Sequence, residues 1–426
     1  MAFSFRTSGR KQEILAALVM AGPAAALAQT NPVIIDWYTV HANQFAKVIE
    51  YTGGSPVTSW PGATAAGLVT SDGRMNSGGV STPTNSDIQQ VRYSATYAYV
   101  DCSGLASYTM GPWYLDIADT KVFGNWPSNK SVLAKFPLSP TPAGGTHASV
   151  GLGTVGLMVN GVALFNNLDS FSYKNSGATD MPGMGGDGYW HRLAIEELPS
   201  FDPANAHQPQ DGTYHYHTNP YGLRYQLNDN IGYSAGVYSE DTSSIHHSPL
   251  LGFSFDGYPV YGPYGYGTAM NSGSAVRRMV AGYMLRNGSN GTTNLTSMGR
   301  HTIPQWSATT YSHSTTLTSG QYGPNVTGGF PLGRYAEDYD YLGDLGFTQG
   351  TTFDLDQYNG RTCVTPEYPG GTYAYFVAMK SDGSPAYPYI LGGQYYGVKS
   401  GGSVASISES VTTFFPTAAV ADWSIY

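Results

Sequence analysis

The sequence predicts a mostly β protein: one large β-sandwich-like domain with one or two short helices. Three observations predict this fold. Several stretches alternate polar and apolar residues, only two segments have helical periodicity, and turn formers are abundant, with 54 Gly and 26 Pro among 426 residues. No period of 20 to 50 residues repeats, which argues against a solenoid or a propeller.

The expected strands are the stretches in which apolar side chains recur at every second position. In chain order they are 91–100, 155–166, 212–217, 250–262 and 371–379. Asn160-Gly161 divides the second stretch, and Asp256-Gly257 divides the fourth. Such dipeptides between apolar runs favour tight hairpin turns, so both stretches are expected to fold back on themselves.

Two segments carry helical patterns. "SAVRRMVAGYMLRN" (274–287) has apolar residues at helical spacing and is followed by Gly288, a typical helix stop. "GYWHRLAIEEL" (188–198) is shorter and is ended by Pro199. We therefore expect one good helix and one short helix.

The first residues have the pattern of a secretory signal peptide. A basic start with Arg6, Arg10 and Lys11 precedes the apolar run 14–28, which ends in Ala-Leu-Ala before Gln29. This pattern predicts cleavage after residue 28 and a secreted or periplasmic protein. No later stretch approaches 18 apolar residues, so no membrane span is expected.

The remaining chain is expected to form one main unit with attachments. Residues 29–149 are predicted to be an N-terminal β segment packed on the core, and 401–426 a C-terminal tail that begins at Gly401-Gly402. The two cysteines, Cys102 and Cys363, favour one disulfide in an oxidising compartment, with two buried thiols as the alternative.

Composition excludes one class of partner. Charged residues are 12% of the chain, the net charge is −9, and the basic residues form no cluster longer than the pair Arg277-Arg278. A nucleic-acid-binding protein normally carries a basic patch, so no nucleic-acid partner is expected.

The histidines are concentrated in one part of the chain, around "GTYHYH" (212–217). Five of the ten histidines fall between 207 and 247. In a strand, His215 and His217 share one face, with Cα atoms roughly 6.6 to 7 Å apart, whereas Tyr214 and Tyr216 point into the opposite side. Two imidazoles at this spacing can bind one metal ion.

We therefore expect a metal site with the ligands His207, His215, His217 and His247. Asp256 is the candidate catalytic residue, either orienting a ligand imidazole or acting as a base on a metal-bound water. Imidazole ligands favour zinc or copper over calcium or magnesium. The alternative is a set of histidines that hydrogen-bond within a polar core.

Three other motifs give weaker evidence of function. "GLGTVG" (151–156) precedes a hairpin rather than a helix, so it is not a dinucleotide fingerprint. "GFSFDG" (252–257) lacks the second glycine of a nucleophile elbow. The acidic residues Glu337, Asp338, Asp340 and Asp344 leave a hard-cation site open, with a solvated acidic loop as the commoner alternative.

Taken together, "DGTYHYH" and "HHSPLLGFSFDGYPVYGPYG" (246–265) resemble the YHYH-domain family, which is named after that tetrad. The blocks 160–166, 276–288 and 354–376 agree, and the resemblance runs from about 150 to about 398, so we assign 150–400 to a YHYH domain. It implies a secreted protein but assigns no biochemical role. The family's recurrent polar residues fall on His207, His215, His217, His247, Asp256 and Glu367. The chain departs from the family pattern at "FDPANAH" (201–207), where many relatives have a Cys-Gly-Gly-His-like stretch.

Two function classes follow. The first is a secreted metal-binding protein, whether enzyme or not, with zinc or copper in a histidine-rich site. The second is an extracellular binding or self-assembling surface module in which the histidine cluster is structural. The 13% of aromatic residues suits a glycan or cell-surface ligand, and free strand edges suit homo-oligomers.

Overall fold

The computed structural model describes residues 29–42, 44–60, 80–116, 118–121 and 123–417. The predicted signal peptide (1–28) and the last part of the predicted tail (418–426) lie outside these ranges. Within them, every helix is too short or too polar to cross a lipid bilayer. The described chain is mostly β, as predicted, with seven separate sheets and only short helices.

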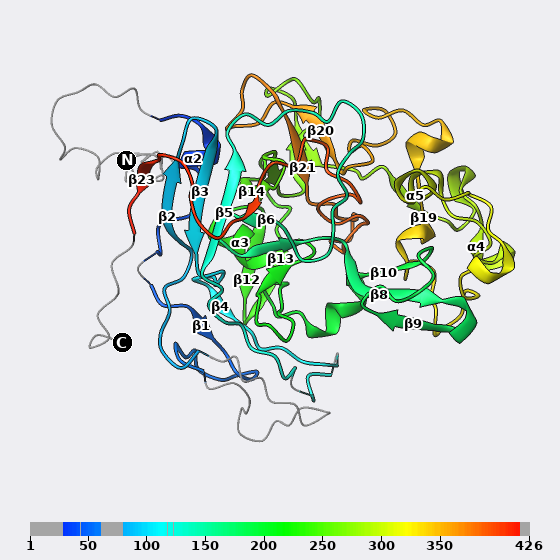
Figure 1. Ribbon diagram of the computed structural model, residues 1–426, viewed down its shortest axis with the longest axis horizontal. Helices are drawn as coiled ribbons and strands as arrows, with labels where there is room; N and C mark the ends of the chain where they lie inside the picture. Colours follow the sequence, from blue (N-terminus) through cyan, green and yellow to red (C-terminus); the bar gives the residue numbers. More distant parts are fainter. Residues whose placement is uncertain (1–28, 43, 61–79, 117, 122, 418–426) are drawn as a thin grey trace.

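The largest sheet has seven strands and forms the centre of the molecule (Figure 1). In sheet order its strands are β11 (His215–Tyr216), β7 (Ala163–Phe165), β6 (Thr154–Met158), β14 (Leu250–Ser254), β15 (Pro259–Tyr261), β21 (Thr372–Phe376) and β20 (Gly360–Cys363). β11 pairs with β7 and β15 pairs with β21 in parallel, and the other neighbours are antiparallel. All residues of β14 and β15 are buried, so this sheet is covered on both faces.

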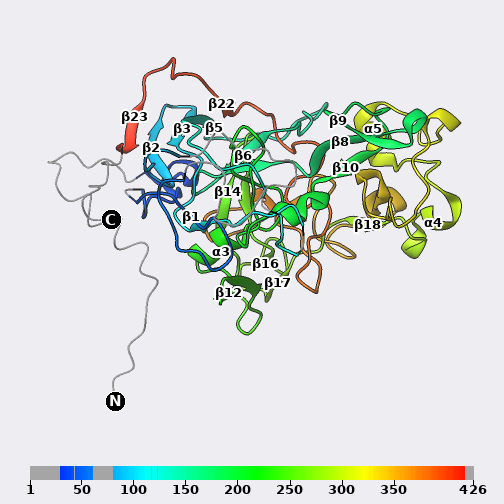
Figure 2. The ribbon, with the colours of Figure 1, turned by 90° about the horizontal axis from the view of Figure 1, so that it is seen from below.

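A five-stranded sheet brings the two ends of the described chain together. Its order is β22 (Gly402–Ser403), β5 (Val132–Pro137), β3 (Tyr97–Cys102), β2 (Ile88–Tyr93) and β23 (Thr412–Phe415). Figure 2 shows the C-terminal segment running across this sheet from β22 to β23. The tail expected to begin at Gly401 therefore supplies both edge strands of a sheet whose inner strands come from the N-terminal segment.

The two large sheets pack on each other through aromatic side chains. Phe136 of β5 lies 6.3 Å from Phe253 of β14, measured between ring centroids, and Trp37 lies 5.2 Å from Phe136 and 5.4 Å from Phe253. These rings belong to one continuous buried cluster that spans both sheets. The N-terminal segment is thus part of the main core.

The rest of the described chain forms smaller elements. A three-stranded sheet has the order β10 (His191–Leu193), β8 (Leu168–Lys174), β9 (Thr179–Pro182). The paired strands are β1 (Lys47–Val48) with β4 (Thr109–Met110), β12 (Ile231–Ser234) with β13 (Val237–Glu240), β16 (Tyr264–Tyr266) with β17 (Val276–Arg278), and β18 (Tyr283–Leu285) with β19 (Tyr339–Tyr341).

The described helices are all short. The α-helices are α2 (Pro32–Ile35), α3 (Tyr221–Gln226), α4 (Leu295–Met298) and α5 (Gln305–Tyr311). The 3-10 segments are η1 (Asn175–Gly177), η2 (Ala194–Ser200), η3 (Ser289–Gly291), η4 (Ser319–Gln321), η5 (Ala336–Asp338) and η6 (Leu342–Leu345). α4, α5 and β19 form a smaller lobe beside β8, β9 and β10 (Figure 1).

Both predicted hairpins are confirmed. β6 and β7 flank Asn160-Gly161, and β14 and β15 flank Asp256-Gly257. Gly161 has a φ of +82° and Gly257 a φ of +88°, which explains why glycine follows Asn and Asp in these turns. The stretch 91–100 contains parts of two strands, β2 and β3, rather than one.

The helix predicted for 274–287 is wrong. β17 and β18 occupy this segment instead, and they pair with β16 and β19. Arg277 donates two hydrogen bonds to the carboxylate of Asp354, and Tyr283 packs against the ring of Tyr387. Helix propensity is weak compared with such tertiary contacts. The short helix predicted for 188–198 is replaced by β10 and the 3-10 segment η2.

The predicted disulfide is also wrong. Cys102 and Cys363 are free and buried, which is the alternative given above. The Cys102 thiol donates to the carbonyl oxygen of Gly161 at 3.3 Å, and burial raises its pKa to about 12. Each cysteine therefore acts as a small apolar core residue.

Close approach of β14 to β6 gives a stability prediction. A Cβ on Gly252 would lie 2.4 Å from the carbonyl oxygen of Leu157 and 2.8 Å from Cα of Met158. Because backbone atoms cannot move away cheaply, we expect Gly252→Ala to lower the free energy of unfolding by roughly 2 kcal/mol or more in urea denaturation.

The matched control is Gly232→Ala in β12. Its Cβ would have no neighbour closer than the Ser239 Oγ at 3.7 Å, so the change should stay within about 1 kcal/mol. Equal losses in both variants would show that β14 and β6 are not packed as closely as described.

Candidate metal centre

The site is built on the edge of the central sheet. β11 pairs with β7, which places His215 beside Ala163 and Tyr216 beside Leu164. On its other side, His215 exchanges two backbone hydrogen bonds with His207, at 2.8 and 3.2 Å. The residues around the tetrad are therefore held between β7 and the chain at His207.

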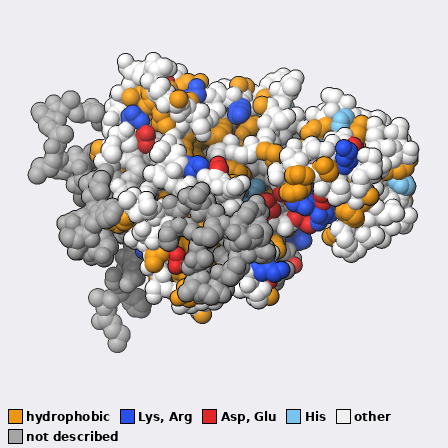
Figure 3. Space-filling view, turned by 60° about the horizontal axis from the view of Figure 1, so that its bottom comes forward, with side chains coloured by type: hydrophobic (Ala, Val, Ile, Leu, Met, Phe, Trp, Pro, Cys, Tyr) orange, Lys and Arg blue, Asp and Glu red, His pale blue; other side chains and the backbone are white. Residues whose placement is uncertain are grey.

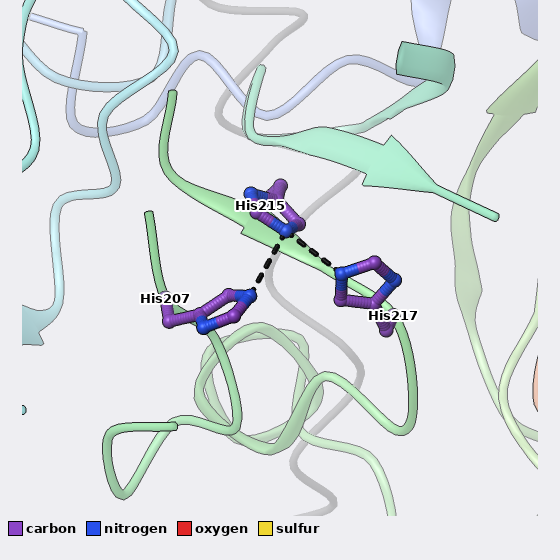
Figure 4. Close-up of side chains that lie close together, drawn as sticks. All are labelled: His207, His215 and His217. Atoms are coloured by element: carbon purple, nitrogen blue, oxygen red, sulfur yellow. Dashed lines mark hydrogen bonds between the residues drawn. The ribbon is translucent and has the colours of Figure 1, made fainter. Parts of the chain in front are cut away.

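Three imidazoles meet at this edge (Figure 4). The Nε2 atom of His215 lies 3.1 Å from Nε2 of His207 and 2.9 Å from Nε2 of His217. Among the residues that the structure describes, these three form the one group of at least three His, Cys, Asp or Glu whose potential ligand atoms all lie within 4.8 Å of one another. We call them the histidine trio.

The hydrogen bonds made by Nδ1 show which nitrogen of each imidazole carries the proton. His215 Nδ1 lies 2.8 Å from the carbonyl oxygen of Thr213, and His217 Nδ1 lies 2.6 Å from that of Asn166. Since a carbonyl oxygen only accepts, both Nδ1 atoms carry the proton. In a neutral ring, Nε2 is then an unprotonated lone-pair donor to a metal.

The same holds for His207 through Ser200. The Ser200 hydroxyl donates to the carbonyl oxygen of Glu197 at 2.7 Å, and it lies 2.7 Å from His207 Nδ1. Its proton is already committed, so Ser200 accepts from Nδ1–H. All three Nε2 lone pairs therefore converge, and no proton lies between them.

Burial disfavours protonation of the trio. All three rings are buried, and burial lowers the pKa of His217 to about 4. Burial, followed by the neighbouring histidines, lowers the pKa of His207 and His215 well below the ordinary value. Lone pairs that face each other at about 3 Å repel, and a bound cation is the arrangement that removes this repulsion.

Phenylalanine side chains enclose the rings. Phe165 stacks on His215 with 3.7 Å between ring centroids, Phe201 meets the His207 ring edge-on at 4.6 Å, and Phe123 lies parallel to His207 at 6.1 Å. This packing holds the imidazole planes of His207 and His215 in position.

A carboxylate lies beside the trio that sequence reasoning did not include. Glu197, in η2, places Oε2 3.4 Å from His217 Nε2 and 3.8 Å from His207 Nε2. Its side chain is 30% exposed, and burial, followed by the charge of Asp169, raises its pKa to about 8. No sequence signal marked Glu197, because it lies in the segment that was expected to form a plain helix.

The trio opens into a pocket of about 420 Å³. The three histidines and Glu197 are among its polar lining residues, and Leu115, Phe123, Leu152 and Leu168 are among its apolar ones. A metal ion bound by the trio would therefore have room for a further ligand, as open catalytic sites do and closed structural sites do not.

The structure does not bring His247 to the trio. Its Nδ1 lies 2.7 Å from the carbonyl oxygen of Ser248, and its ring packs 4.6 Å from Tyr266 and 5.5 Å from Tyr261. The expected fourth ligand therefore has a separate aromatic environment.

Asp256 is also placed elsewhere. It is fully buried and accepts hydrogen bonds from Ser254, from the Tyr375 hydroxyl at 2.7 Å and from the Gly397 amide at 2.8 Å. The Nδ1 atoms of the trio are taken by Ser200, Thr213 and Asn166, so Asp256 does not orient a ligand imidazole. Its partners are those of a structural carboxylate at a hairpin. Glu367 likewise bonds the Tyr261 hydroxyl, at 2.8 Å.

The acidic residues at 337–344 are mostly ion-paired. Glu337 contacts His191 Nδ1 at 2.7 Å, Asp338 binds Arg300 through two hydrogen bonds, and Asp340 lies 3.3 Å from Arg286. These three buried carboxylates have cationic partners in the protein and form an ion-pair network, whereas Asp344, the fourth member of the predicted cation site, is exposed.

The pKa values predict how the metal-free protein responds to acid. His217 stays neutral in the fold down to about pH 4, whereas the unfolded chain binds a proton near pH 6.5. The unfolded state therefore binds more protons between these values, and stability falls as the pH is lowered from 6.5 to 4. The loss from His217 alone is about 3 kcal/mol.

Urea unfolding of chelator-treated protein between pH 7.5 and 4 measures this. His217→Gln removes the titrating ring. Over the same pH range, the fall in the unfolding free energy of this variant should therefore be about 3 kcal/mol smaller than that of the unaltered protein. Parallel curves for the two proteins would contradict a buried neutral His217.

Comparison with known proteins adds one finding. The family model described as "YHYH protein" matches residues 133–388, more than half of the 426-residue chain and including the whole tetrad and all three histidines of the trio. No curated protein and no solved structure matches the chain. The match begins within β5, somewhat before the boundary expected at 150. The chain belongs to the YHYH protein family.

Proposed function

We propose that the protein binds one zinc or copper ion through Nε2 of His207, His215 and His217. The observation that carries this proposal is the set of three converging Nε2 lone pairs, each fixed by an acceptor at Nδ1. A polar core that only needed hydrogen bonds would place a donor opposite each of these lone pairs, whereas here the Glu197 carboxyl lies within hydrogen-bond distance of one of them, that of His217, at 3.4 Å.

The donor set favours these metals. Imidazole nitrogens suit zinc and copper, whereas calcium and magnesium prefer oxygen ligands. Nitrogen ligands at about 2.0 to 2.1 Å in a tetrahedral site are about 3.3 Å apart. The separations of 3.1 and 2.9 Å are close to this value, so small ring movements would accommodate an ion.

The pocket supports a metal centre that binds a small molecule. Three protein ligands leave a coordination position free, and here the free side is open to solvent-accessible space. Metal-assisted hydrolysis and copper redox chemistry both use such a position. The signal-peptide pattern of residues 1–28 supports action outside the cytoplasm, in the periplasm or the medium.

Metal content of histidine variants tests the proposal. The mature protein, residues 29–426, is dialysed against zinc or copper and analysed for bound metal. We expect one ion per chain, and His215→Ala or His217→Ala should weaken binding by roughly 100-fold or more because each removes a ligand.

His247→Ala is the matched control, because His247 has the same side chain but lies outside the trio. It should retain the ion. Full retention in His215→Ala and His217→Ala, or loss in His247→Ala alone, would overturn the proposed site.

A second candidate is a surface-binding module, favoured by an aromatic cluster formed by α3 and the hairpin β12–β13. Tyr225 and Tyr233 are 44% and 49% exposed, and their rings pack with that of Tyr238 at centroid distances of 4.5 to 5.7 Å. Figure 2 shows β12 projecting from the body of the molecule. Exposed aromatic patches often contact a ligand or another surface.

Glycan-array binding before and after chelation separates the two candidates. A surface module would bind a glycan equally well without metal, and Tyr233→Ala would reduce that binding about tenfold or more. Absence of binding, or unchanged binding in Tyr233→Ala, would remove the tyrosine cluster as a ligand site.

A further inference from the structure

The pocket above the histidine trio has an uneven charge. Three carboxylates line it, those of Asp169, Glu196 and Glu197, and its described lining includes neither Lys nor Arg. An anionic group entering the pocket would find no cationic side chain of the wall to pair with. The charged side chains on the face in Figure 3 are few and gather mainly where the two lobes meet.

The three carboxylates differ in their partners. Asp169 pairs with Arg192 and Glu196 pairs with Arg334, in both cases through close hydrogen bonds. Neither arginine lines the pocket, so these ion pairs fix the positions of Asp169 and Glu196 without placing a cation in the pocket. In the described ion pairs Glu197 contacts only His207 and His217, and its carboxylate therefore keeps capacity for a donor from the pocket.

Much of the remaining pocket lining is apolar. Leu115, Leu152 and Leu168 line the pocket together with the rings of Phe123 and Phe165. Leu152 is 49% exposed, so much of its side chain is available to a ligand. Apolar walls with a few convergent polar groups are the common composition of small-molecule sites.

We infer that this pocket takes a neutral or cationic organic molecule with a compact apolar group, and that Glu197 accepts a hydrogen bond from its polar end. The inference rests on the proposed metal centre, which lies at the base of the same pocket. The apolar group contacts the leucine and phenylalanine walls. The polar end lies toward the trio, where Glu197 faces it. In the metal-free protein, anionic molecules of the same size are disfavoured by the ionised carboxylate of Glu197, whereas the charges of Asp169 and Glu196 are balanced by their arginines.

Three probes that share a phenyl ring test this: cationic benzamidine, neutral 4-phenylimidazole and anionic benzoate, with imidazole as the probe that lacks the ring. Their affinities for the chelator-treated, metal-free protein are measured by calorimetry at pH 9, where Glu197 is ionised and no metal ion can coordinate the imidazole or carboxylate of a probe. We expect benzamidine and 4-phenylimidazole to bind at least about tenfold more tightly than benzoate. Both can donate a hydrogen bond to the Glu197 carboxylate, whereas the carboxylate of benzoate is repelled by it.

Two variants separate the charge from the apolar wall. Glu197→Gln should weaken benzamidine about tenfold while strengthening benzoate, and Asp241→Asn, an exposed carboxylate outside the pocket, should change neither. Leu152→Ala should weaken all three phenyl probes a few-fold but leave imidazole unchanged, since only the phenyl ring contacts that wall.

The outcomes distinguish the inference from the metal proposal. A protein that binds metal but holds benzoate as tightly as benzamidine overturns the inference and leaves the metal centre. A protein without metal overturns the proposed function, and the same titrations then decide the inference, since Glu197 and the apolar walls need no ion. Probe affinities unaffected by both Glu197→Gln and Leu152→Ala also overturn it.

Discussion

The hydrogen bonds at Nδ1 of the three imidazoles determine what the rest of the pocket can do. Each Nδ1–H is taken by an oxygen acceptor from a different part of the chain: Ser200, Thr213 and Asn166. With those protons fixed, Nε2 can only accept. The protein has therefore arranged three acceptors around one point and buried them, and this costs free energy unless a cation is present.

The fold supports this arrangement through the two sides of one short strand. While His215 and His217 face the pocket, Tyr214 and Tyr216 are buried on the other side, where both hydroxyls bond that of Tyr108. Tyr214 also donates to Asp202 at 2.7 Å. Alternation along the tetrad thus has two uses, since the tyrosines anchor the strand whose histidines form the site.

Local patterns predicted the parts of the molecule that local interactions determine. The Asn160-Gly161 and Asp256-Gly257 turns need left-handed glycine, and the shared face of His215 and His217 follows from strand geometry. His207 was proposed as a ligand because of its proximity in sequence, and the structure brings its ring to the other two.

What could not be predicted depends on contacts distant in sequence. Glu197 and Ser200 reach the trio from a 3-10 segment whose position depends on the pairing of β10 with β8. The segment 274–287 has helical periodicity but pairs with β16 and β19 instead. His247 is near the tetrad in sequence, yet it directly precedes the β14–β15 hairpin and packs against Tyr261 and Tyr266 instead.

The position of β23 has a consequence for how the protein is made. β2 lies near the N-terminus of the described chain, and its outer neighbour β23 is among the last described residues. During translation, β2 must keep an open edge until Thr412–Phe415 have left the ribosome. The sheet reaches full width only after these residues have been made, so the nascent chain relies on delayed closure rather than on stepwise folding from its first strands.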